Sequence, residues 1–197
     1  MKKMKIIAVL GAAAITVLVA GAAIANFQSD TVKASQNLEM KSLSVDIGVD
    51  KEFETGKSIF PGQTLIEAMN VKNTANTDVY VRVTVKSYYE QNGEKIFLDS
   101  DLIKMDTEGI SDWIIASQDE EETVMYYALP VAEGESSTDF MNSLYLDGDM
   151  GNEFQGLGLT VSVKTEAIQA SLAEEAMMSE WGVMPTIVEG VITEISE

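Results

Sequence analysis

The sequence predicts a mainly β protein in which antiparallel sheets stack as a β-sandwich, with one or two short helical segments. Two observations support this prediction: several runs alternate between apolar and polar residues, and turn-forming residues separate them. Side chains of a strand point alternately to opposite faces, so each run has one core face and one solvent face. Many short strands with turn signals between them are typical of a sandwich.

The alternation is clearest in the runs 43–49, 79–86 and 157–164, which favours antiparallel sheets with one solvated side. Their apolar positions are Leu43, Val45, Ile47, Val49, Val79, Val81, Val83, Val85, Leu157, Leu159, Val161 and Val163. Shorter strands are expected at 113–116, 124–129 and 143–146.

Turn signals lie between these runs. Pro61-Gly62 is a tight-turn pair, and the polar segment 73–78 connects two alternating runs. Asn92-Gly93 lies between two aromatic-rich stretches and is a strong hairpin signal. The four adjacent acids at 119–122 repel one another, so we expect a solvated loop there.

The segment 166–179 is the main helical candidate, with Thr165 as its cap. Its apolar residues recur every four positions, at Ile168, Leu172 and Ala176. The alternative is that the strand before it continues through Thr165 and Ala167 in unchanged parity. After Pro185, the β-branched tail is either a last strand or a loose arm.

The first 25 residues have the layout of a secretory signal peptide. A basic head precedes an uncharged run at 6–25, which ends in the small residues Ala23 and Ala25, and cleavage is expected after Ala25. The alternative is an uncleaved anchor, because the run is long enough to span a bilayer. Its richness in Ala and Gly favours cleavage, which leaves one secreted domain.

The chain is strongly acidic, with a formal net charge of −19. Cleavage would remove Lys2, Lys3 and Lys5 and no acid, which makes the mature charge about −22. Such a surface repels nucleic acid and anionic lipid, so neither is an expected partner. No second long apolar run follows, so we expect a mature protein that is not embedded in a membrane.

The chain contains no histidine and no cysteine. These absences exclude a disulfide framework, zinc-protease motifs, a cysteine nucleophile and a Ser-His-Asp triad. SxxK, GxSxG, P-loop and GxGxxG patterns are also missing. Paired carboxylates can hydrolyse glycosides, but 32 acids single out no pair. The sequence therefore predicts a protein that is not an enzyme.

One loop has the composition of a weak Ca²⁺ site, and this is the one cofactor the sequence suggests. Asp147, Asp149, Asn152 and Glu153 place hard oxygens in a glycine-bearing segment. The EF-hand spacing is incomplete, because Gly151 stands at its fifth position. The alternative is an acidic surface turn.

Several short motifs occur in a specific order along nearly the whole chain. Phe27 follows the cleavage site, Pro61-Gly62 leads into a strand, and the connection 73–78 leads into the valine-rich run. The segment 152–156 then precedes a strand that ends at 166–170, and Trp181 follows. In this order the chain resembles the TasA/camelysin family, which are exported biofilm-matrix proteins of Gram-positive bacteria.

The resemblance implies a jelly-roll sandwich and a homopolymeric fibre subunit, processed by a SipW-type signal peptidase and found in the extracellular matrix or at the cell surface. Donor-strand complementation in that family implies a donor from Asn26 to about Ser35, within an N-terminal segment at 26–37. Residues 38–197 would form the sandwich. The donor's interaction residues would be Asn26, Phe27, Asp30 and Val32. Phe27 and Val32 have opposite parity, so this segment has no single apolar face.

Three functions therefore remain open. The first is a structural subunit that assembles by strand donation, because the edge strands of a sandwich recruit other chains. The second is a monomeric secreted surface-binding module, with or without calcium. The third is a camelysin-type protease, which no residue of the sequence supports.

Overall fold

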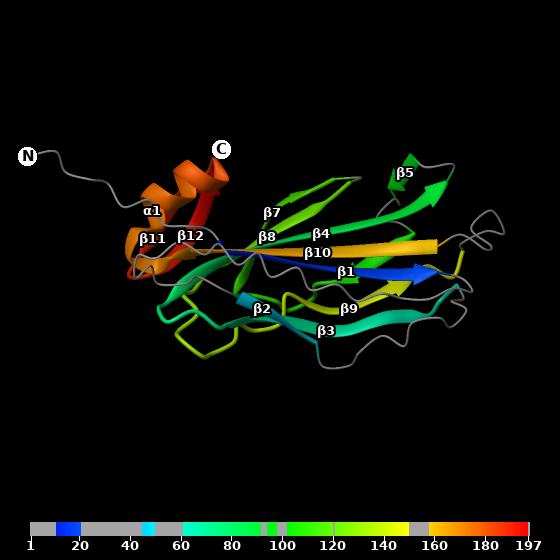
Figure 1. Cartoon of the computed structure of the whole chain (residues 1–197), viewed down its shortest axis with the longest axis horizontal. Coiled ribbons are helices and arrows are strands. Elements are labelled where there is room, and N and C mark those ends of the chain that lie inside the picture. Colours follow the sequence, from blue (N-terminus) through cyan, green and yellow to red (C-terminus); the bar gives the residue numbers. More distant parts are fainter. Residues whose placement is uncertain are drawn as a thin grey trace, which may run out of the picture.

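The computed structural model describes residues 11–20, 45–49, 61–91, 94–97, 102–119, 121–149 and 158–196. Within these ranges the chain is mainly β, and its two larger sheets are antiparallel throughout. Figure 1 shows the strands in two layers, an arrangement consistent with the expected β-sandwich. No helix in the described ranges is long and apolar enough to cross a membrane.

The first sheet has the strand order β1-β10-β4-β8-β7, and β5 pairs with the far end of β4. Its strands are β1 Gly11–Ala20, β10 Gly158–Gln169, β4 Val79–Gln91, β8 Thr123–Tyr127, β7 Trp113–Gln118 and β5 Glu94–Phe97. Gln91 is opposite Glu94, so a two-residue connection joins β4 to β5, as Asn92-Gly93 predicts. Those two residues themselves lie outside the described ranges.

The second sheet has the order β2-β3-β9-β6. Its strands are β2 Val45–Val49, β3 Thr64–Asn73, β9 Met141–Leu146 and β6 Ile103–Asp106. The main core lies between the two sheets, where Val71 and Leu144 of this sheet belong to one buried cluster with Val83 and Val163 of the first. Burial of these facing apolar sides is the main stabilising contribution.

The predicted helix start is wrong, because β10 continues to Gln169. Thr165 and Ala167 are fully buried in unchanged parity, so the alternation continues through the predicted cap. The helical turns then follow as η2 Ala170–Leu172, α1 Ala173–Ala176 and the π-helical turn η3 Met177–Trp181.

The tail after Pro185 belongs to a hairpin, which settles the alternative between a strand and a loose arm. Strands β11 Met184–Val188 and β12 Val191–Ser196 pair around a turn in which Glu189 and Gly190 both have positive φ. This hairpin and the helical turns gather at one end of the molecule (Figure 1). They form a second buried cluster with residues of the first sheet: Tyr80, Tyr126, Ile168, Ala173, Ala176, Met177, Trp181, Val183 and Ile192.

The polar connection between β3 and β4 is organised by Asn73, whose side chain is fully buried. Its Nδ2 donates to the carbonyl oxygens of Thr77 at 2.8 Å and Val131 at 2.9 Å. Its Oδ1 accepts the Ala75 N–H at 2.9 Å. A buried amide with every polar atom engaged stabilises one conformation of the connection.

Candidate functional site

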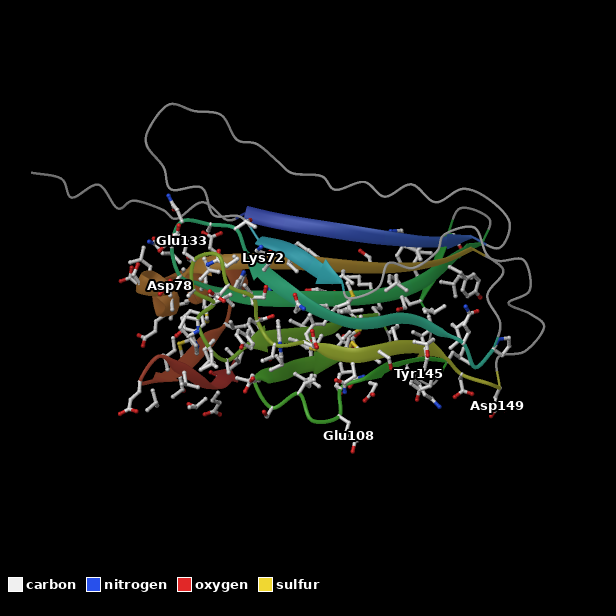
Figure 2. The ribbon with its side chains drawn as sticks, turned by 90° about the horizontal axis from the view of Figure 1, so that it is seen from below. Lys72, Asp78, Glu108, Glu133, Tyr145 and Asp149 are labelled. Carbon is white, nitrogen blue, oxygen red and sulfur yellow. The ribbon has the colours of Figure 1, made fainter. Side chains whose placement is uncertain are left out.

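The outer edge of β10 is the feature of the fold that bears most directly on function. On one side β10 pairs with β4, from Leu159 opposite Tyr89 to Gln169 opposite Val79. On the other side it pairs with β1, the outermost strand of the sheet. Figure 1 shows β1 lying alongside β10, and in Figure 2 the same blue strand lies along the upper side of the sheets.

The β1 strand lies entirely within the segment that the sequence predicts to be a removable leader. Ten continuous register pairs join it to β10, from Gly11 opposite Ala167 to Ala20 opposite Gly158. Without residues 1–25, β10 would lose this partner along almost its whole length. An unpaired strand of that length is a template for pairing with another chain.

The face of β10 directed into the sandwich is apolar and closely packed. Val161, Val163, Thr165 and Ala167 are all fully buried in it. Alternation of side chains fixes which residues face the core, so a one-residue slip of an added strand would turn its apolar residues to the solvent. The edge therefore specifies both the register and the pattern of a strand that pairs with it.

The opposite face of β10 carries an ion cluster centred on the buried Glu166 carboxylate. Arg82 of β4 donates from Nε and Nη2 to Oε2 of Glu166, at 2.9 and 2.5 Å, and Lys164 lies 3.0 Å from the other carboxylate oxygen. The Arg82 guanidinium also lies 5.1 Å from the centre of the Trp181 ring. These contacts join β4, β10 and the helical turns, and they hold β10 in place independently of β1.

The candidate Ca²⁺ residues are only partly described. Asp147 and Asp149 share one turn, in which the Asp149 N–H donates to Oδ1 of Asp147 at 2.8 Å. The Lys104 ammonium pairs with Oδ2 of Asp147, and these two contacts hold the pKa of the Asp147 carboxyl below its usual range, with Lys104 the larger cause. Asn152 and Glu153 lie outside the described ranges. Asp149 lies at the opposite end of the molecule from Asp78 and Glu133 (Figure 2).

A second acidic region borders a hollow of about 760 Å³ that β6 and the β7–β8 turn help to line. Its acids are Asp106, Glu108, Asp119, Glu121 and Glu122. The Asp119 carboxylate accepts the N–H groups of Glu122 and Glu121, which lowers its pKa, and Glu122 pairs with Lys86 at 2.5 Å. In the described part of the chain, no group of three or more acids is arranged to hold a metal ion.

The remaining predicted site residues lie outside the described ranges. These are the cleavage-site residues Ala23 and Ala25 and the donor residues Asn26, Phe27, Asp30 and Val32. Their predicted roles in cleavage and strand donation stay predictions.

Sequence reasoning found the β10 strand but not its position beside β1, the outermost strand of the sheet. Alternation shows which face of a strand is buried, but it does not show which strands lie beside it. The β-branched residues Ile15, Thr16, Val17 and Val19 are a signal that the leader has strand propensity.

Comparisons with protein-family models, with curated proteins and with solved structures found no match to the chain.

Proposed function

We propose that the protein is an exported structural subunit of extracellular biofilm-matrix fibres, built on a jelly-roll sandwich and assembled head to tail by donor-strand complementation. The observation that supports this proposal is that the outer partner of β10 is β1, a strand inside the predicted leader. Once the leader is removed, the β10 edge needs a strand from elsewhere.

A second copy of the chain is the natural source of that strand. Cleavage after Ala25 would make the segment 26–37 the new N-terminus. This segment precedes the sandwich in the sequence, so it can serve as a donor. Donation from each subunit to the next is a heterologous contact, and such contacts make filaments when they do not close into rings. Main-chain hydrogen bonds would supply affinity and alternate side chains would supply specificity.

The acidic composition fits a polymer that grows end to end. A net charge of about −22 per mature subunit opposes side-by-side clumping, and salt or acid reduces this repulsion. Assembly should therefore be faster at pH 5 than at pH 7, and faster as the salt concentration rises.

The direct test compares the chain 26–197 with a shorter chain that begins at residue 36. Light scattering and electron microscopy at pH 7 and pH 5 should find filaments of the longer chain alone. In the longer chain, Phe27→Ser should reduce filament formation, and the neighbouring change Gln28→Ser is the matched control. N-terminal sequencing of the secreted protein should begin at Asn26.

Monomers of both chains under every condition would instead favour a secreted surface-binding module. For its calcium form, the melting temperature of 26–197 should rise with Ca²⁺, and Asp147→Asn with Asp149→Asn should reduce the rise. No rise in the parent chain would remove that idea. Casein cleavage that a chelator abolishes would support the camelysin-type protease.

A further inference from the structure

The leader strand fits the β10 edge in detail. Its ten register pairs with β10 run without a shift or bulge, unlike the pairing of β3 with β9 or of β7 with β8. A continuous register of this length satisfies the backbone groups along nearly all of the edge. The leader is therefore a partner for β10 from Gly158 to Ala167.

One parity of the leader matches the buried face of β10. Ile15 and Val17 are opposite Val163 and Val161, two residues that are fully buried. In the other parity, Thr16 is opposite Ser162, which is half-buried. Cross-strand pairs of β-branched residues stabilise sheets.

The leader residues also differ in size along the strand. Gly11 is opposite Ala167 and Ala13 is opposite Thr165, so the smaller leader residues come at the end of the edge where Ala167 lies. The larger ones follow from Ile15 to Val19, and Ala20 opposite Gly158 is small again.

We propose that Gly11–Ala20 is a built-in cap of the β10 edge, so that leader cleavage opens the acceptor site for assembly. This inference rests on the proposed function, and it names how that site is regulated. The uncleaved chain is then a folded monomer that cannot accept a donor. The released leader strand, supplied as a separate peptide, competes with donors for the same edge.

The test uses the full chain 1–197, made without its processing peptidase, beside 26–197. Hydrogen exchange measures the protection of the β10 amides, and sedimentation measures assembly. In 1–197, Val17→Asp puts a charge at a position opposite a buried residue, whereas Thr16→Asp puts the same charge one residue away in the other parity. A synthetic peptide of residues 11–20 is added to 26–197 during growth.

We expect 1–197 to stay monomeric with protected β10 amides, which exchange at least about tenfold faster in Val17→Asp than in Thr16→Asp. The peptide should slow the growth of 26–197. If 1–197 and 26–197 assemble equally well, the cap is wrong and the fibre function stands. If β10 exchanges equally fast in 1–197 and in dilute monomeric 26–197, the cap is also wrong. If leader removal exposes β10 but 26–197 never assembles, the cap stands and the fibre function is wrong.

Discussion

Arg82 and Glu166 form a two-pronged ion pair across neighbouring strands β4 and β10, with both guanidinium hydrogen bonds on Oε2 of the carboxylate. The side chain of Glu166 is 6% exposed and that of Arg82 17%. A pair this buried is expensive to break from one side, because the remaining charge is left without its partner in an apolar setting.

Arg82→Met should therefore lower the free energy of unfolding by about 3 kcal/mol, although Lys164 keeps part of the Glu166 charge compensated. The double change Arg82→Met with Glu166→Leu should recover much of the loss. Urea unfolding measures both. The control is Lys86→Met, since Lys86 pairs with Glu122 near the surface and its loss should cost less than about 1 kcal/mol. Equal losses for Arg82 and Lys86 would contradict this account.

Phe140 joins the two sheets beside Trp113. Its side chain is fully buried, and its ring lies 5.6 Å from the Trp113 ring in an edge-on arrangement. Phe140→Ala should cost about 4 kcal/mol, because it removes a large apolar side chain and leaves a cavity. Ile115→Ala on β7, at a position 41% exposed, should cost less than about 1 kcal/mol. An unchanged melting temperature in Phe140→Ala would contradict the placement of this ring in the core.

Asn73→Asp tests the buried polar centre of the β3–β4 connection. The carboxylate keeps the size of the amide but loses the donor that faces the carbonyls of Thr77 and Val131, so at pH 7 it should cost at least about 2 kcal/mol. The folded-state pKa of this new carboxyl should be raised, so the loss should shrink as the pH falls below that value. Asn76→Asp, in the exposed part of the same connection, is the control. A loss that is independent of pH would argue against this reading.

Asp147 should contribute to acid sensitivity. Its contacts with Lys104 and with the Asp149 N–H lower its folded-state pKa, so its stabilising effect is present above the unfolded-state pKa of about 3.9. That effect is lost as the pH falls through the folded-state value. An NMR titration of the Asp147 carboxyl should give a low pKa that Lys104→Met moves back toward its usual range. An unchanged titration in Lys104→Met would show that Lys104 is not the main cause.

Much of the fold was predictable because alternation encodes burial directly. The alternation predicts that one face of the strand at 79–86 points to the core, and all four of its apolar residues are buried in β4: Val79, Val81, Val83 and Val85. The strand β6 escaped prediction, because it has only four residues and just one of them, Ile103, is buried. So short a run does not establish a period.

The helix boundary and the candidate site depended on contacts distant in sequence. The residues after Thr165 fit a strand and a helix equally well. In the structure they continue the strand, and Ile168 is buried in the cluster that contains Tyr126 and Trp181. The pairing of Ile15 with Val163 joins the beginning of the chain to its last third. The apolar segment predicted to be a leader also has strand propensity, and the tertiary structure shows which strand it pairs with.

The two tryptophans of the chain lie in different buried clusters, Trp113 between the sheets and Trp181 at the end of the helical turns. The molecule therefore contains an intrinsic fluorophore for each of its two cores. Replacement of either one by Phe leaves an emission signal that reports on the other core alone. Non-coincident melting of the two signals would reveal that the C-terminal hairpin and its turns detach before the sandwich opens.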